Sequence, residues 1–150
     1  MFEQKLTELG INIPEAPKPL ASYIPAVRSG NLIFTSGQLP LKDGKLQYIG
    51  KVGAEISEEA AMKAAEICAI NCLSAAKTLI NSIDQIKQVI KVTVFVASAS
   101  GFNAQPKIAN GASDLMVKIF GDLGKHSRSA VGVAELPLNS PVEIEMIFEV

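Results

Sequence analysis

Two oppositely charged side chains, Arg128 and Glu143, lie in apolar, strand-like stretches near the C-terminal end of the sequence. Arg128 is surrounded by small and apolar residues, and Glu143 alternates with Val142 and Ile144. Burial of a charge is costly unless the charge is paired, hydrogen-bonded or kept for a ligand. Arginine suits the paired capture of a carboxylate, and a carboxylate can position or activate water. The two residues are therefore either a structural ion pair or parts of a binding site.

Several further residues can contribute to such a site. Ser36 and Gly37 end a predicted strand, where they offer a hydroxyl and close backbone approach to a ligand, although a β-bulge is the alternative. Tyr23 either caps a pocket or packs against the body of the protein. Asn110 lies in a predicted helix and would more often be a surface residue. His126, the single histidine, is expected to be solvated or to make an interface contact.

Strand alternation decides which of these side chains share a face. It places Arg128 beside Ala130 on one face, and it turns Glu143 away from the apolar side of the last strand. If the last two strands form a hairpin around residues 135–141, Arg128 lies roughly 15 Å from Glu143. A shared site then combines Arg128 of one subunit with Glu143 of its neighbour.

The elements that position these residues follow from hydrophobic periodicity and from helix and turn signals. They are a helix over 2–9, an irregular proline-containing segment over 13–25, strands over 26–28 and 32–38, a helix over 57–81, a strand over 87–97, a helix over 105–120, and strands over 128–134 and 142–150. This order predicts an α+β sandwich with a mixed sheet and two helices packed on one face. The other face, carrying either Lys91, Thr93 and Phe95 or the Arg128 row, is expected to meet solvent or another subunit.

Length and composition exclude several classes of protein. The 150 residues suit one domain over 1–150, with residues 1–24 as an N-terminal extension. A net charge of -1 and 5% aromatic residues argue against a nucleic-acid partner. No stretch has the length of a membrane span and no signal peptide is evident, so the expected location is the cytoplasm. Cys68 and Cys72 are expected to be buried thiols, and no metal site is expected.

Two segments resemble the signatures of the RidA/YjgF family of reactive intermediate deaminases. They are GNLIFTSGQLP, residues 30–40, and RSAVGVAELP followed by PVEIEMI, within residues 128–147. The resemblance implies a chorismate-mutase-like α+β fold, a homotrimer with clefts between subunits, and no cofactor. It also implies hydrolysis of 2-imino acids, which arise from enamines, to 2-keto acids and ammonia. The proline-rich N-terminal extension is similar to a longer, less characterised branch of the family.

The resemblance also assigns roles to individual residues. Arg128 matches the arginine that holds the substrate carboxylate, and Glu143 matches the glutamate that positions water, as in a 2-iminobutanoate/2-iminopropanoate deaminase. The substrate-binding positions lining the cleft are Tyr23, Ser36, Gly37, Asn110 and Ala130. Many deaminase members have cysteine where this chain has Ala130. The alternatives are therefore a trimer that binds small carboxylates without turnover, or an endoribonuclease or translation inhibitor.

Overall fold

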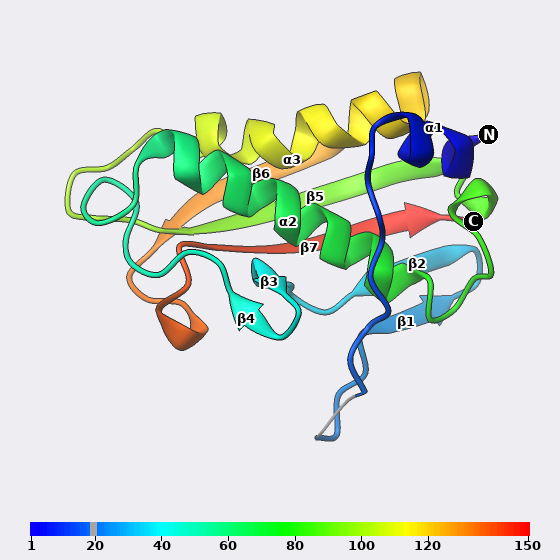
Figure 1. Ribbon diagram of the computed structural model, residues 1–150, viewed down its shortest axis with the longest axis horizontal. Helices are drawn as coiled ribbons and strands as arrows, with labels where there is room; N and C mark the ends of the chain where they lie inside the picture. The colour runs from blue at the N-terminus through cyan, green and yellow to red at the C-terminus, as the bar shows by residue number, and fades with distance from the viewer. Residues whose placement is uncertain (19–20) are drawn as a thin grey trace.

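A five-stranded mixed sheet forms the centre of the protein, which the computed structural model describes for residues 1–18 and 21–150 (Figure 1). Its strands, in spatial order, are β1 (Ala26–Ser29), β2 (Leu32–Thr35), β7 (Val142–Glu149), β5 (Gln88–Ala97) and β6 (Ser127–Val133). All neighbouring pairs are antiparallel except β5 and β6. Because parallel neighbours need a crossover connection, a helix must join β5 to β6.

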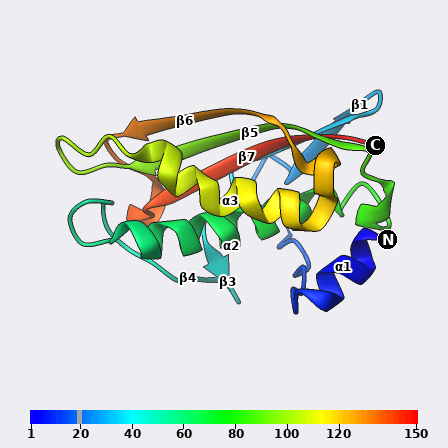
Figure 2. The same ribbon diagram turned by 90° about the horizontal axis from the view of Figure 1, so that it is seen from above.

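Two long helices lie side by side on one face of the sheet, and the described residues place no helix on the other face (Figure 2). The helical segments are α1 (Phe2–Glu8), α2 (Glu58–Ala76), η1 (Ile83–Gln85), α3 (Gln105–Phe120), η2 (Gly121–Gly124) and η3 (Pro137–Asn139). A small separate hairpin consists of β3 (Leu41–Lys42) and β4 (Lys45–Leu46). The predicted α+β architecture, with a mixed sheet and two covering helices, is confirmed.

Small residues let the two long helices pack closely. The buried face of α2 is rich in alanine and contains the thiols of Cys68 and Cys72. At Gly111 of α3, an added Cβ would lie 2.2 Å from the backbone oxygen of Met62 in α2, so only glycine fits without a shift. α2 begins after its N-cap, Ser57, whose side chain accepts a hydrogen bond from the backbone N–H of Ala60.

Three helix and strand details differ from the predictions. β2 ends at Thr35 rather than at residue 38, because its ladder with β7 is interrupted before Gln38 bridges to Ile144. α2 ends at Ala76 rather than near residue 81, because the next residues form tighter i to i−3 hydrogen bonds, as from the N–H of Thr78 to the carbonyl of Ala75. In β5, a register shift between Val89 and Lys91 interrupts the alternation. Val89 is consequently fully buried, whereas Ile90, which strict alternation with Val92 would place on the core face, is half-buried.

The predicted hairpin of the last two strands is wrong. β5 lies between β6 and β7, with β6 parallel to β5 because α3 carries the chain back along the sheet. Arg128 pairs with Val92 of β5, and Glu143 pairs with Phe95. Cross-strand partners share a face, and Val92 and Phe95 are an odd number of positions apart, so Arg128 and Glu143 face opposite sides of the sheet.

The face of β6 that carries Arg128 is covered by α3, so it is not the open face, which was one of the two predicted alternatives. Val92, the partner of Arg128, is fully buried under the helices. The open face instead carries the other predicted set, Lys91, Thr93 and Phe95, which are half-buried in the chain. The residues that share a strand face were predicted correctly, and the structure selects the first of the two predicted alternatives for the open face.

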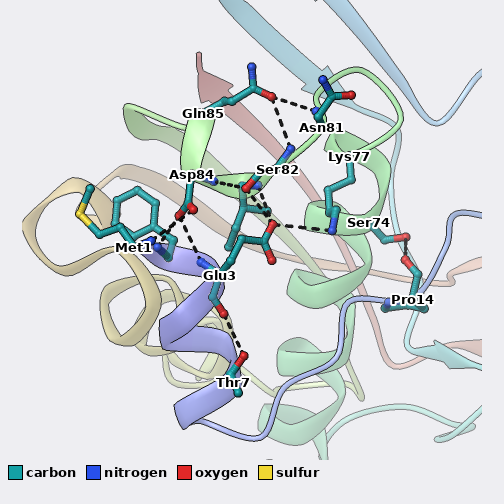
Figure 3. Close-up of polar contacts among 12 residues, drawn as sticks. Met1, Glu3, Thr7, Pro14, Ser74, Lys77, Asn81, Ser82, Asp84 and Gln85 are labelled. Carbon is teal, nitrogen blue, oxygen red and sulfur yellow. Dashed lines mark hydrogen bonds and ion pairs between the residues drawn. The ribbon is translucent and has the colours of Figure 1, made fainter.

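The N-terminal helix α1 is fastened to the body by two carboxylates that cap each other's helices (Figure 3). Asp84 of η1 accepts hydrogen bonds from the backbone N–H groups of Phe2 and Glu3. Glu3 in return accepts hydrogen bonds from the Ser82 hydroxyl and the Ile83 N–H, each at 3.0 Å. Both carboxylates therefore satisfy N–H groups that a first helical turn leaves without partners.

The segment between α1 and β1 is irregular wherever it is described, as its prolines predict. It runs beside α2, where the Ser74 hydroxyl donates a 2.5 Å hydrogen bond to the carbonyl of Pro14 (Figure 3). Pro19, one of the prolines behind the prediction, lies outside the described residues. Phe2 and Leu6 of α1 are buried with the main hydrophobic core, so this helix contributes to the body of the protein.

Candidate functional site

The predicted site residues fall into two groups on opposite sides of the sheet. Arg128 and Asn110 meet between β6 and α3, and Ala130 lies on the same face of β6. Glu143 lies on the open side of β7, next to Gly37. A single chain therefore does not bring the arginine and the glutamate together.

The guanidinium of Arg128 is held by two neutral side chains of α3. Its Nη1 donates to Oδ1 of Asn110 at 2.8 Å and to Oγ of Ser113 at 3.2 Å. Asn110 and Ser113 are three residues apart in a helix and so share one face. Asn110 is therefore a partner of Arg128 rather than the solvated surface residue that its helical position suggested.

The remaining donors of Arg128 are available. Nη1 uses both of its hydrogens on α3, and across residues 1–18 and 21–150 no hydrogen bond or ion pair involves Nε or Nη2. The side chain is half-buried, so its charge is partly removed from water. The Nε and Nη2 edge presents two parallel N–H donors, which match the two oxygens of a carboxylate.

Behind Arg128, Ser113 is hydrogen-bonded to His126. The Ser113 hydroxyl lies 2.9 Å from Nε2 of His126, and Nδ1 of His126 lies 2.6 Å from the carbonyl oxygen of Gly124. His126 is therefore a bonded, half-buried residue, so of its two predicted surroundings the solvated one is wrong, and the interface contact stays a prediction. Sequence reasoning did not select Ser113, and it did not place His126 behind Arg128. The available signals were the helical spacing from Asn110 to Ser113 and the shared strand parity of His126 and Arg128.

Ala130 lies next along the face of β6 that carries Arg128. It pairs with the buried Val94 and packs, half-buried, against the core. Beyond it, Gly132 is approached by the side chains of Gln105 and Ser98, whose nearest atoms would lie 2.8 and 3.0 Å from an added Cβ. Along the face of β6 that α3 covers, the side-chain groups thus change from the guanidinium of Arg128 to the methyl group of Ala130 and then, beside Gly132, to the amide of Gln105 from α3.

Glu143 is a half-buried carboxylate without an ion-pair partner in the described parts of the chain. Burial, and to a lesser extent the charge of Glu145, raises the pKa of Glu143 above its usual value. Its Oε1 approaches the backbone of Gly37 so closely that an added Cβ would lie 2.2 Å away. Gly37 therefore leaves room for the carboxylate. The bulge that was its alternative is also present, because three residues between Phe34 and Gln38 oppose only two between Ile147 and Ile144 of β7.

Ser36 and Tyr23 lie near this glutamate but are bound or exposed in the single chain. The Ser36 hydroxyl donates to the carbonyl of Ile24 at 2.7 Å, which fixes the chain next to Tyr23. The Tyr23 side chain is 64% exposed. Tyr23 and Gly37 border a cavity of about 480 Å³ between the N-terminal segment 14–18, α2 and the β3–β4 hairpin. Arg128, Asn110 and Glu143 do not line this cavity.

The described residues contain neither a candidate metal site nor a candidate membrane-spanning helix. Residues 1–18 and 21–150 contain no cluster of three or more His, Cys, Asp or Glu side chains with the geometry to hold a metal ion. None of the helices in these ranges combines the length and apolar character needed to cross a membrane.

Comparisons with known proteins agree with this fold. The family described as "YjgF/chorismate mutase-like, putative endoribonuclease" matches residues 3–150. Protein TCP17 of Trypanosoma cruzi is 39% identical over 145 residues, which cover 96% of this chain and 91% of TCP17. A 2-iminobutanoate/2-iminopropanoate deaminase of Dermatophagoides farinae is 34% identical over 137 residues, covering 91% of this chain and 92% of the deaminase. The crystal structure of Atu1372, a protein of unknown function from Agrobacterium tumefaciens, matches with a TM-score of 0.93 and 43% identity, over 99% of this chain and 92% of Atu1372.

Proposed function

Because this chain belongs to the YjgF/chorismate mutase-like family, also called RidA/YjgF, we propose that it is a hydrolytic deaminase that converts 2-imino acids into 2-keto acids and ammonia. One relative carries the name of such a deaminase, and its similarity extends over 91% of this chain. The site residues proposed for this chain are Arg128 as the carboxylate anchor and Glu143 as the base that positions water.

The observation that carries the proposal is the state of Arg128. Its guanidinium is half-buried, is held from one side by Asn110 and Ser113, and has no acidic partner among the described residues. A structural ion pair would need a carboxylate at this position. The free Nε and Nη2 edge instead suits the carboxylate that every 2-imino acid carries.

Glu143 suits the hydrolytic step. A carboxylate with a raised pKa is a better proton acceptor than an ordinary one, provided that it is ionised at the working pH. The oxygen of water bonds to the imine carbon, and Glu143 accepts a proton from that water. The carbon–nitrogen bond then breaks, both water hydrogens end on the nitrogen, and ammonia leaves. Because the imine carbon is already electrophilic, positioning supplies much of the acceleration.

The two groups must come from different subunits, since they face opposite sides of the sheet in one chain. A homotrimer with three clefts is the assembly that we propose, and the open sheet face supports it. This face exposes apolar side chains, including Val27 at 52%, Phe34 at 41% and Val131 at 44%. Apolar patches of this kind mark interaction surfaces, and homo-oligomers are mostly closed and symmetric. Burying the open face would also bring Glu143 to an interface.

Ammonia release from 2-iminopropanoate and 2-iminobutanoate, generated in situ, tests the proposal. Arg128→Ala is expected to lower kcat/KM by about a hundredfold, because two charge-assisted hydrogen bonds to the carboxylate are lost. Arg28→Ala is the matched control, since Arg28 is an exposed arginine whose Nε donates to the carbonyl of Gly30. Activity that is equal in wild type and Arg128→Ala would refute the proposed anchor.

A second candidate is a trimer that binds small carboxylates without turnover. Ala130, a methyl group next to the guanidinium where many deaminases have cysteine, favours it. Titration with 2-oxobutanoate, a 2-keto acid, separates the two functions. Binding that depends on Arg128, without ammonia release from any of several imino acids, would establish the binding protein instead of the enzyme.

A further inference from the structure

A row of hydrogen bonds runs from Arg128 into the space between α3 and η2. Nη1 of Arg128 donates to Oγ of Ser113 at 3.2 Å, Oγ lies 2.9 Å from Nε2 of His126, and Nδ1 of His126 lies 2.6 Å from the Gly124 oxygen. All three side chains are half-buried. The row therefore joins the guanidinium, through Nη1, to the backbone of the segment that precedes β6.

The last acceptor, the carbonyl oxygen of Gly124, fixes which group donates and which accepts in each hydrogen bond of the row. The carbonyl oxygen of Gly124 only accepts hydrogen bonds, so Nδ1 of His126 must carry a hydrogen. In the neutral ring Nε2 is then an acceptor, and the Ser113 hydroxyl donates to it. Oγ of Ser113 consequently turns its lone pairs toward Arg128, whose guanidinium only donates. Every group in the row has the role that its neighbour requires.

The orientation of the Ser113 hydroxyl matters because Nη1 of Arg128 carries two hydrogens, and each needs an acceptor. Asn110 accepts one and Ser113 the other, so the plane of the guanidinium is held at two points. An arginine side chain has several rotatable bonds, and ordering it for each binding event would cost conformational entropy. A guanidinium that is already fixed presents its Nε and Nη2 edge to a carboxylate without that cost.

We propose that Ser113 and His126 are positioning residues that orient Arg128 for the substrate carboxylate, an inference that rests on the proposed function and names two further residues of the same site. Neither side chain is assigned contact with the substrate. Ser113 acts on Arg128 directly, and His126 acts through Ser113 by orienting its hydroxyl.

Titration calorimetry with 2-oxobutanoate, together with steady-state ammonia release, tests the inference. Ser113→Ala is expected to raise Kd and KM by about tenfold, the loss of one hydrogen bond to a charged group, while kcat stays close to wild type. His126→Ala is expected to raise both by about threefold, because the hydroxyl loses its fixed direction but remains. Ser113→Thr, which keeps the hydroxyl, should restore binding to within about twofold of wild type.

Ser127→Ala is the matched control for hydroxyl removal. The Ser127 side chain lies on the other face of β6, where it donates to the carbonyl of Ile90 at 2.9 Å, so its loss should leave Kd unchanged. Thermal unfolding of each variant checks that the fold is retained. A Ser113→Ala variant with wild-type Kd, in a protein whose binding Arg128→Ala abolishes, would overturn the inference and leave the proposed function standing. Wild-type binding in Arg128→Ala would instead overturn the proposed function.

A measurement without ligand tests the row separately. The chain has a single histidine, so the long-range ¹H–¹⁵N spectrum of its ring needs no assignment. The neutral ring is expected as the Nδ1–H tautomer, and Ser113→Ala should shift the Nε2 resonance because its donor is lost. A neutral ring with the hydrogen on Nε2 would contradict the row even if no 2-keto acid bound to the wild-type protein.

Discussion

Oligomers that mix Arg128→Ala subunits with Glu143→Ala subunits are expected to regain activity that neither variant has alone. In each variant every cleft lacks either the anchor or the base. In a mixed oligomer, a cleft that takes its arginine from a Glu143→Ala subunit and its glutamate from an Arg128→Ala subunit is intact. The two substitutions therefore complement each other only if the site is shared between subunits.

Arg128 and Glu143 are too far apart in one chain to form a site within a single subunit, so only a site between subunits allows complementation. Arg128 and Glu143 lie on the strands that flank β5, and their partners in β5 are Val92 and Phe95. Two strand spacings across the sheet and three residues along it separate the Cα atoms by about 14 Å. The side chains also point to opposite faces, so one small 2-imino acid does not reach both.

The size of the recovery follows from the symmetry of a ring. In a trimer with two subunits of one kind and one of the other, one cleft in three combines the intact arginine with the intact glutamate. Purified mixed trimers should therefore have about one third of wild-type kcat per subunit, with an unchanged KM. Co-expression with two different affinity tags and purification on both tags isolates these species, and ammonia release measures them. Mixed trimers as inactive as the parent variants would refute the shared site.

Three further substitutions test the surroundings of these residues. Gly37→Ala is expected to lower kcat by about tenfold with little loss of stability, because its Cβ would occupy the place of the Glu143 Oε1 atom, 2.2 Å away, and the flexible carboxylate would move; assays of kcat and Tm check this. Glu143→Gln should raise Tm relative to wild type at pH 8 but not at pH 4. Burial raises the pKa of this carboxylic acid, so the folded state binds its proton more tightly than the unfolded state, and wild-type stability falls as pH rises through that range. The exposed Glu66→Gln is the control, and equal pH dependence in both variants would contradict the sign. Asp84→Ala removes the cap of α1, so the amides of that helix should exchange with solvent faster while those of β5 do not, as hydrogen exchange measured by mass spectrometry would show.

Local signals in the sequence predicted most of the elements. Pro106 in the first turn and the apolar periodicity give α3 its bounds, Gln105–Phe120, and the expected helix over 105–120 is confirmed. Strand parity correctly placed Glu143 on the side of β7 away from the core. The end of α2 and the shift in β5 were missed, because each depends on hydrogen bonds that only the folded chain selects.

The sequence by itself determined which residues could do chemistry and which neighbours share a strand face, because both follow from side-chain type and from an alternation of two. It also carried the two signatures of the family. The tertiary structure decided that β5 separates β6 from β7 and that α3 covers Arg128. The strand order and the covered face depend on a helical crossover and on burial of the sheet under two helices. These are long-range interactions, which the alternation of residues within one strand does not predict. For the same reason only the folded chain reveals Ser113 and His126 behind the arginine.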